Sequence, residues 1–548
     1  MSALDTNIPE NFLFDESKNK IGLDANKYVV KSRNITGIID QQKGSGTYLT
    51  SKVIIDAQSF GNSADVVSWS EAYITLPYRV TLSATAGSTS TITGSYNNNF
   101  FTSLKNNCFI ESLKVEQAGR TIVNETGNLS HLVNFVKHCT STQESLETQT
   151  CVNAYYPDGD LANVVTANLQ GVVNNTNFYN GTNYSVPFND GLFKRQKALL
   201  PSNMTAASGV FSSTTNQLAE MGTYQSVTTP PTTIATTGTT LSDIHFVAVI
   251  YLKDLSDYFC PEKHPWSRGL GYKFTLTVNQ AVTTATQTTT TTPFNVLPTI
   301  AATTTYSSAT VQPAMLNIGP NTIAGNSSIT ATSTTYSYTL TSVIDTTTDA
   351  RQAGIMLWVP SYILTEDSNL QLNSEPIMYR SPFMINSAFY DNRSANQPIN
   401  LQLFSAISNP RALIIIPQYN QGVQGQPSQC SPHNPCPGVS DPLLSLTKIQ
   451  VRVNSRPVLP NNSNYAYQQF IDHTNRIFKI NGGQSPVSSG VISLSKFLNN
   501  YRYYAFDLTQ ACDESQKDVP QLITFEGFNN SSVSVDLYVY VLYEQSAT

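Results

Sequence analysis

The 548-residue sequence predicts a mostly β protein built from two similar halves. Three observations lead to this prediction: a composition that favours strands, segments in which apolar and polar residues alternate, and a series of elements that occurs twice. Tyr and Phe contribute 28 and 24 residues, whereas charged residues make up only 12% of the chain, about half the usual share. Aromatic and β-branched residues fit a pleated sheet, and abundant Ser and Asn fit turns, so sheets are favoured over long helices.

Hydrophobic periodicity locates the strands. Apolar residues recur at every second position, as expected for strands with one solvated face, in residues 71–82, 272–278, 449–454 and 535–543. Other segments are apolar on both faces, as expected for strands buried on both sides: residues 246–252, 354–359 and 412–416. Helices are expected to be few and short, among them one that Asn128 can cap and that carries a stripe of Leu129, Leu132, Val133 and Val136.

One series of elements recurs in the second half of the chain. Strand Leu113–Val115 and the following Arg120 correspond to Ile449–Val451 and Arg456, both at an offset of 336 residues (449 − 113; 456 − 120). In each half a short helix follows. The second series therefore indicates a duplicated unit.

The short helices carry matching aromatic and histidine residues. Phe135 and His138 correspond to Phe470 and His473, 335 residues later (470 − 135; 473 − 138). A shared packing or hydrogen-bonding role explains matching histidines better than chemistry does. We therefore regard His138 and His473 as candidate packing or interface residues.

A second pair of segments extends the duplication. Strands 246–252 and 501–506 each run into an Asp-Leu pair and a short helix, and each half then ends in an alternating strand, 272–278 and 535–543. The distance from the helix to the Asp-Leu pair is 116 positions in the first half (His138 to Asp254) and 34 in the second (His473 to Asp507). The first half therefore has 82 more residues there (116 − 34). This insertion is rich in Asn, Thr, Gly and Ser, which is typical of a system of surface loops.

Two units of roughly 200 to 250 residues predict two packed antiparallel sandwiches, and eight-stranded jelly rolls fit the strand-rich character and long loops. We expect an N-terminal arm and first strand at 1–40, and a first jelly roll at 41–284 with its insertion at about 140–243. A Thr-rich connector is expected at 285–334, and the second jelly roll at 335–548.

Charge and hydropathy exclude several classes of protein. A net charge of −6 without a basic tail disfavours wrapping or sequence-specific binding of nucleic acid. Residues 1–24 lack the apolar core of a secretory signal, and no stretch of the sequence has the roughly 18 consecutive apolar residues of a membrane span. The odd number of seven cysteines at low density fits assembly in a reducing cell interior.

Two pairs of residues stand out as candidate sites. Cys430 and Cys436 bracket a Pro-rich loop that contains His433, and this spacing allows free loop thiols, a disulfide formed in oxidising medium, or part of a Cys/His metal site. Tyr538 and Tyr540 lie on a strand face that should meet solvent, which indicates burial in an interface with the neighbouring half of the chain or with another subunit. The sequence contains no HExxH or Gly-x-Ser-x-Gly motif, so we predict no catalytic residue, resident metal or cofactor.

Several segments, in order along about 450 residues, resemble those of one protein family. They are Ser103–Asn107, Arg120–Asn124, Asn189–Arg195, Ile244–Leu255, Gly271–Phe274, Leu357–Tyr362, Asn409–Pro417, Asn499–Asp507 and Asp536–Glu544. On these segments the chain resembles the double jelly-roll major capsid proteins of polinton-like viruses and virophages, relatives of the adenovirus hexon lineage.

The resemblance implies a structural protein of the virion, not an enzyme. It implies homotrimers that form pseudo-hexagonal capsomers and tile an icosahedral shell around a double-stranded DNA genome. Its implied partners are neighbouring capsomers, a separate penton protein and minor capsid proteins, with assembly inside the infected host cell.

Two other functions compete with this one. A trimeric receptor-binding or glycan-binding β spike or fibre would form stable trimers but no shells. A β-sandwich glycoside hydrolase would need two carboxylates held about 5 to 10 Å apart in an aromatic cleft. Carboxylates are sparse in this sequence, and no pair stands out.

Overall fold

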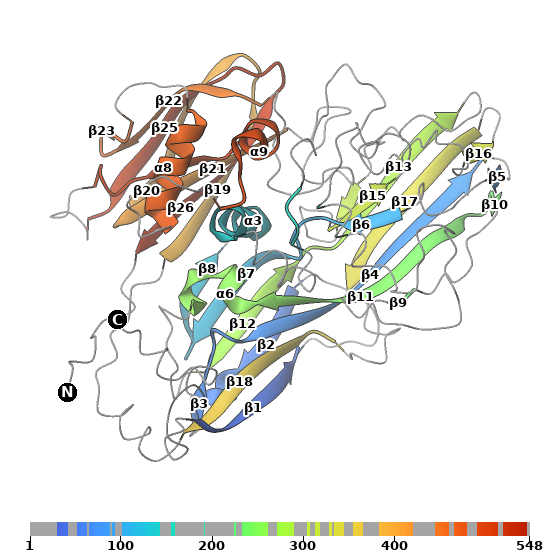
Figure 1. Cartoon of the computed structure of the whole chain (residues 1–548), viewed down its shortest axis with the longest axis horizontal. Helices are drawn as coiled ribbons and strands as arrows, with labels where there is room; N and C mark the ends of the chain where they lie inside the picture. Colours follow the sequence, from blue (N-terminus) through green and yellow to red (C-terminus); the bar gives the residue numbers. More distant parts are fainter. Residues whose placement is uncertain are drawn as a thin grey trace.

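The structure is a computed structural model of the whole chain. It describes residues 30–41, 52–62, 65–87, 90–93, 101–125, 127–142, 155–158, 191, 195, 224–225, 233–260, 271–289, 304–306, 313–317, 328–330, 334–344, 354–364, 383–419, 444–459, 465–478, 490–512 and 519–544. Strands dominate these residues, and the two longest described helices, α3 (Leu129–Thr140) and α8 (Tyr467–Phe478), have 12 residues each. The predicted mostly β class with short helices is confirmed (Figure 1).

The second half has the strand order of a jelly roll. Its strands follow the chain as β19 (Phe383–Arg393), β20 (Gln397–Ile407), β21 (Pro410–Tyr419), β22 (Leu446–Val453), β23 (Arg456–Pro457), β24 (Tyr504–Asp507), β25 (Gln521–Asn529) and β26 (Val535–Glu544). In space they form the antiparallel sheets β19-β26-β21-β24 and β20-β25-β22-β23. If the eight strands are lettered B to I in chain order, the sheets read B-I-D-G and C-H-E-F, which is the jelly-roll arrangement.

The first half repeats this order. Its eight framework strands are β1 (Val30–Ile39), β2 (Lys52–Ala57), β4 (Tyr73–Ala86), β7 (Ile110–Gln117), β8 (Arg120–Glu125), β11 (Thr239–Tyr251), β12 (Tyr272–Val278) and β18 (Met356–Leu364). Strands β1, β18, β4 and β11 are neighbours in one sheet, and β2, β12, β7 and β8 in the other. These are again B-I-D-G and C-H-E-F, so the predicted pair of tandem jelly rolls is confirmed.

Additional strands lengthen the first B-I-D-G sheet. Strand β4 pairs with β18 only through Tyr73–Thr75, and its remaining length, Tyr78–Ala86, pairs with β17 (Thr334–Ile344). The sheet continues through β13 (Ala281–Thr289) to β14 (Thr304–Tyr306). In Figure 1 these long strands run together away from the second half.

Shorter elements complete the described structure. The small strands are β3 (Val66–Val67), β5 (Ser90–Thr93), β6 (Phe101–Leu104), β9 (Tyr224–Gln225), β10 (Thr233–Ile234), β15 (Ala314–Asn317) and β16 (Ser328–Thr330). The short helices are η1 (Gln58–Asn62), α6 (Leu252–Leu255), η4 (Asp257–Phe259) and α9 (Leu494–Asn499). Strands β15 and β16 pair with β6 and β5 of the first half.

The observed pairing differs from the predicted division of the chain. The prediction began the second jelly roll at residue 335, but β17 and β18 belong to the first B-I-D-G sheet, and β18 is its strand I. We therefore propose a division between Leu364 and Phe383. On this division the Thr-rich residues 285–334 lie within the connection between strands H and I of the first jelly roll. Residues 1–29 and most of the predicted insertion at 140–243 lie outside the described residues.

One correspondence between the halves was wrong. Residues 272–278 form strand H and therefore correspond to β25, whereas 535–543 lie in strand I and correspond to β18. The H–I connection spans residues 279–355 in the first half and only 530–534 in the second. This difference in length breaks the constant offset, although the offset of 336 holds for strands E and F (446 − 110; 456 − 120), and helices α3 and α8 are 338 residues apart (467 − 129).

Candidate functional site: the contact between the two jelly rolls

Strands β26, β21 and β24 of the second B-I-D-G sheet are buried on both faces. Along β26, Leu537, Val539 and Val541 face the core of the second jelly roll, and the alternate residues Tyr538 and Tyr540 join a different apolar cluster. The first eight residues of β26 are all buried. The prediction of one solvated face for residues 535–543 was therefore wrong, because helix α3 of the first half and helices α8 and α9 of the second half cover that face.

Helix α3 of the first half shares the described cover with helices α8 and α9 of the second half. Leu129 and Val133 pack into the core of the first jelly roll, whereas Leu132, Phe135 and Cys139 join the outer face of the second B-I-D-G sheet. The Phe135 ring meets Tyr503 edge to face at 5.1 Å between centroids. Two apolar faces thus make α3 a shared element of both jelly rolls, and Figure 1 shows it lying between them.

The start of α3 is built differently from the prediction. Asn128 has a left-handed backbone (φ 58°) and makes no side-chain cap hydrogen bond to the helix. Its N–H instead donates to Oε1 of Glu111 at 2.9 Å. Its carbonyl accepts a hydrogen bond from the Tyr540 hydroxyl at 2.8 Å, so this turn joins the two halves.

Tyr538 and Tyr540 are buried against the first half of the same chain, with 2% and 1% of their surfaces exposed. The Tyr538 ring lies 4.4 Å from the ring of His131 on α3, measured between centroids. Burial raises the pKa of Tyr540 well above its ordinary value, so its hydroxyl keeps the proton that it donates to Asn128.

His138 lies near the end of α3 and is fully buried. Its ring nitrogens lie 3.2 Å from the Tyr503 hydroxyl and 3.4 Å from the side-chain amide of Asn106, and its ring stands 4.2 Å from that of Tyr501. Burial lowers the pKa of His138 well below its ordinary value, and Lys496 and Arg195 lower it further. The ring is therefore neutral at pH 7.

His473 lies in the middle of α8, about one helical turn earlier in its helix than His138 is in α3. Its Nδ1 accepts a hydrogen bond from the backbone N–H of Asp507 at 3.0 Å, and burial lowers its pKa. Tyr503 directly precedes β24, and Asp507 is its last residue. The two matching histidines thus bind the two ends of one strand, one from each half of the chain.

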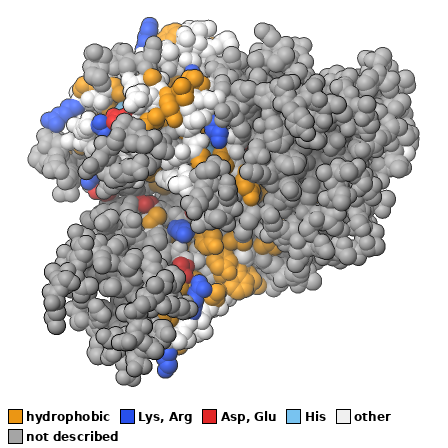
Figure 2. Space-filling model, viewed as in Figure 1, with side chains coloured by type: hydrophobic (Ala, Val, Ile, Leu, Met, Phe, Trp, Pro, Cys, Tyr) orange, Lys and Arg blue, Asp and Glu red, His pale blue; other side chains and the backbone are white. Residues whose placement is uncertain are grey.

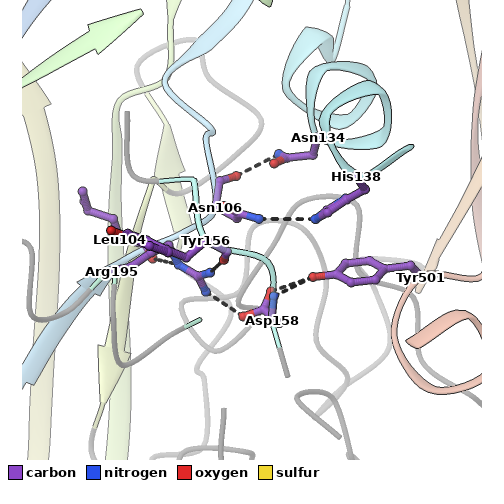
Figure 3. A network of polar contacts seen from close by, with 8 residues as sticks. All are labelled: Leu104, Asn106, Asn134, His138, Tyr156, Asp158, Arg195 and Tyr501. Carbon is purple, nitrogen blue, oxygen red and sulfur yellow. Dashed lines mark hydrogen bonds and ion pairs between the residues drawn. The ribbon is translucent and has the colours of Figure 1, made fainter. Parts of the chain in front are cut away.

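A buried ion pair forms the polar centre of the contact (Figure 3). Arg195 and Asp158 have side chains with 0% exposure, and Nη2 of Arg195 lies 2.7 Å from Oδ1 of Asp158. The guanidinium also donates to the carbonyl of Leu104 at 2.9 Å and to that of Tyr156. These four residues all belong to the first half.

Tyr501 links this ion pair to the second half. Its hydroxyl donates to Oδ2 of Asp158 at 3.2 Å and accepts from the Asp158 N–H at 2.9 Å. In the same view Asn134 of α3 donates to the carbonyl of Asn106, so the helix and the ion pair are fixed to one region (Figure 3). Every charge in the pair has hydrogen-bond partners, which is the condition for burying it.

Sequence reasoning missed the network of Asp158, Arg195 and Tyr501. Asp158 lies within a Pro-Asp-Gly turn signal, and Arg195 ends the segment Asn189–Arg195. Neither spacing nor periodicity indicates that residues 37 and 343 positions apart meet. No local signal singles them out, because Asp160 lies close to Asp158 in the sequence and Lys194 lies next to Arg195.

The described residues contain no group of three or more His, Cys, Asp or Glu side chains that could hold a metal ion. Burial raises the pKa of the Cys108 thiol to about 12 and that of Cys139 well above its usual value, so both stay protonated. Cys430 and Cys436 lie outside the described residues, and their state stays a prediction. Among the described helices none is long and apolar enough to span a membrane.

Replacement of Arg195 tests the buried ion pair. In Arg195→Met the Asp158 carboxylate stays buried without its counter-charge, and we expect a loss of about 3 to 5 kcal/mol in the free energy of unfolding. Urea denaturation followed by circular dichroism measures this. The matched control is Arg476→Met, which removes a half-exposed ion pair with Asp472 and should cost less than about 1 kcal/mol. Equal losses in both variants would contradict the assignment.

His138 predicts a specific pH dependence. The unfolded chain protonates this histidine near its ordinary pKa of 6.5, but the folded chain does not, because its folded pKa is depressed. Stability is therefore complete above about pH 6.5 and falls as the pH drops toward the folded pKa, by at most about 1.4 kcal/mol per pH unit.

Replacement by an uncharged side chain isolates this effect. His138→Gln should lower stability at pH 7.5 but flatten its decline between pH 6.5 and 5.5, as measured by urea denaturation across that range. His473→Gln, whose pKa is lowered less strongly, should flatten the decline less. If the stability of His138→Gln declined over this pH range as steeply as that of the native protein, the pKa of His138 in the folded chain would not be depressed.

Comparisons with known proteins give structural neighbours only. No family model and no curated protein sequence matches the chain. The structure is similar to that of the Sputnik virophage solved by electron microscopy, with a TM-score of 0.45 and 11% identity over 96% of this chain and 88% of the other. It is also similar to the mavirus major capsid protein, with a TM-score of 0.43 and 11% identity over 99% and 93% of the two chains. For PBCV-1 VP54 the TM-score is 0.39 at 8% identity, with 95% of each chain covered. The assignment of two jelly rolls rests on the strand pairing within this chain and does not depend on these similarities.

Proposed function

We propose that this chain is a viral major capsid protein that forms homotrimers, and that the trimers tile an icosahedral shell around a double-stranded DNA genome. The observation that carries the proposal is the presence of two complete jelly rolls, each B-I-D-G and C-H-E-F, joined by a buried contact. A fold alone does not determine a function. The family resemblance of the sequence supports the same assignment.

The joined pair has a geometric use in a shell. Three chains around a three-fold axis present six similar sandwiches, and a block with this outline fits a hexagonal lattice. Such a block needs a fixed angle between its two halves. The shared helix α3 and the buried Arg195–Asp158–Tyr501 network supply that rigidity.

The proposal includes a place and partners for the protein. It lies in the capsid of the virion, is assembled inside the infected host cell, and contacts neighbouring capsomers, a penton protein and minor capsid proteins. The net charge of −6 suits a shell that encloses DNA without wrapping it. On this proposal the work of the protein is burial of complementary surfaces, and it has no enzymatic role.

The mass of the recombinant protein in solution tests the proposal. Light scattering should give about three times the chain mass of 60.0 kDa, and negative-stain microscopy should show six-sided particles or closed shells. A stable monomer under all conditions would contradict the proposal. Trimers that bind glycans on an array and never form six-sided particles or shells would favour the alternative of a receptor-binding or glycan-binding spike or fibre.

A further inference from the structure

The end of helix α3 is joined to the second half through His138. Its ring nitrogens lie 3.2 Å from the hydroxyl of Tyr503 and 3.4 Å from the amide nitrogen of Asn106, and its ring centroid lies 4.2 Å from that of Tyr501. These four residues are here called the His138 contact. A neutral imidazole suits this contact, because such a ring donates one hydrogen bond and accepts another. On the face of the molecule drawn in Figure 2 histidine side chains are scarcely visible, in keeping with the full burial of His138.

Neither ring nitrogen of His138 has a carboxylate partner among the described residues. Positive charges nearby, on Lys496 of α9 and on Arg195, disfavour a proton on the ring. The Asp158 carboxylate, which Tyr501 connects to the His138 contact, is already paired with Arg195. A protonated His138 ring is therefore a buried charge without a counter-charge, which is a costly arrangement inside a protein.

The other groups around His138 supply no free negative charge. Phenol and thiol groups lose their protons only in alkaline solution, and the one further carboxylate, that of Asp254, lies 2.8 Å from Nζ of Lys137. The remaining charged or titratable residues in or beside the segments that touch the ring are Lys105, Lys137, Cys139, Tyr155, Tyr501 and Tyr503.

The C-terminal end of α3 compensates for a proton on His138 only in part. Carbonyl groups at a helix end favour a nearby cation, and His138 lies two residues before the last helical residue, Thr140. However, the carbonyl of His138 already accepts a hydrogen bond from the Val491 N–H at 2.9 Å, and that of Lys137 accepts one from the Ser141 N–H at 2.9 Å. Backbone donors thus already satisfy this end of the helix.

His473 on α8 lies in a different electrostatic setting. Burial lowers its pKa, but the carboxylates of Asp472 and Asp507 oppose that shift, whereas Arg476 adds to it. Both carboxylates belong to the second half, as does the backbone N–H of Asp507 that His473 binds. Protonation of His473 is therefore less costly than that of His138, and it acts within one half of the chain.

The His138 contact lies outside both jelly-roll cores. The two cores are separate apolar clusters, and Phe135, Tyr501 and Tyr503 belong to a third cluster between them. Figure 3 shows the His138 side chain extending from the end of α3 toward Asn106, with Tyr501 of the second half beside it. An opening confined to this third cluster leaves each core with its own packing.

We propose that the His138 contact is an acid-sensitive switch: in mildly acidic solution the ring takes up a proton, and the end of α3 separates from Tyr501 and Tyr503 while both jelly rolls stay folded. Histidine is the side chain whose charge ordinarily changes between pH 5 and 8, and buried histidines at interfaces serve as such switches. The pH dependence of global unfolding does not by itself say which contact opens first. The switch is a property of the single chain, whereas its use, to loosen a capsid shell in an acidic compartment, rests on the proposed function.

The sign and size of the effect follow from two protonation equilibria. In the closed state the pKa of His138 lies well below its ordinary value, and in the open state the ring regains the ordinary value of about 6.5. The open population therefore rises as the pH falls, by about ten-fold between pH 7.5 and pH 5.5.

Backbone hydrogen exchange of the full-length protein, followed by mass spectrometry at these two pH values, tests the switch. After correction for the intrinsic pH dependence of exchange, amides in the last turns of α3 and in residues 501–507 should exchange about ten-fold faster at pH 5.5. Amides of β12 and β25, which lie inside their sheets, should keep their protection. Equal acceleration in β12 and β25 would show global unfolding and overturn the inference.

Replacement of the histidine identifies the titrating group. His138→Gln keeps a side chain that donates and accepts hydrogen bonds but cannot take up the proton, so the acceleration at pH 5.5 should disappear. The matched control His473→Gln should retain it. An undiminished acceleration in His138→Gln would assign the opening to another group and overturn the inference.

Exchange of the C2 hydrogen of histidine provides a second measurement that needs no substitution. In the native protein this exchange, read by mass spectrometry, should give His138 a titration midpoint below the ordinary value of about 6.5. A midpoint at or above the ordinary value would overturn the inference even if His138→Gln failed to fold.

Shells of the native protein test the use of the switch separately. Shells assembled at pH 7.5 should admit a DNA-binding dye faster after transfer to pH 5.5, and shells of His138→Gln should not. Dye entry that is equal at both pH values would overturn this use. Native protein that forms neither trimers nor shells would overturn the proposed function, whereas the exchange measurements on the single chain would still decide the switch.

Discussion

The burial of helix α3 on two sides is the constraint on which the rest of the structure depends. One side of the helix closes the first jelly roll through Leu129 and Val133, and the other covers the second through Leu132 and Phe135. Burial of one large apolar side chain contributes roughly 1.5 to 3 kcal/mol. Separation of the two jelly rolls would expose both this side of α3 and the outer face of β26, so the halves behave as one body.

Polar groups make this apolar contact selective. A buried ion pair adds little net stability compared with apolar side chains, but the loss of one partner is costly. The Arg195–Asp158 pair therefore penalises any arrangement in which Tyr501 and the carbonyls of Leu104 and Tyr156 no longer surround it. Apolar packing holds the halves together, and the hydrogen-bonded charges select one arrangement of them.

The two halves share a strand order but differ in what surrounds it. In the second half the H–I connection is short, and the outer face of β26, β21 and β24 is covered within the chain. In the first half the H–I connection adds β13 and β17 to the sheet, and the aromatic row at Tyr251, Tyr73 and Trp358 stays partly exposed. The two halves therefore have similar frameworks with different surfaces.

Much of the framework was predictable because its signals are local. Alternation placed strands at 272–278 and 449–454, helical spacing placed α3, and the offset between Arg120 and Arg456 matched strands F of the two halves. Strand I of the first half was not assigned correctly, because its partners β1 and β4 are distant in sequence and the long H–I connection hides the correspondence.

The sequence by itself determined the fold class, the duplication and the expectation that the two tyrosines on the last strand are buried in an interface. Each of these depends on composition or on spacing along the chain. Only the tertiary structure decided what buries Tyr538 and Tyr540, which histidine meets which end of β24, and that Asp158, Arg195 and Tyr501 form one network. These contacts join residues hundreds of positions apart. Their energies depend on distance and burial in space, and no periodicity in the sequence records those quantities.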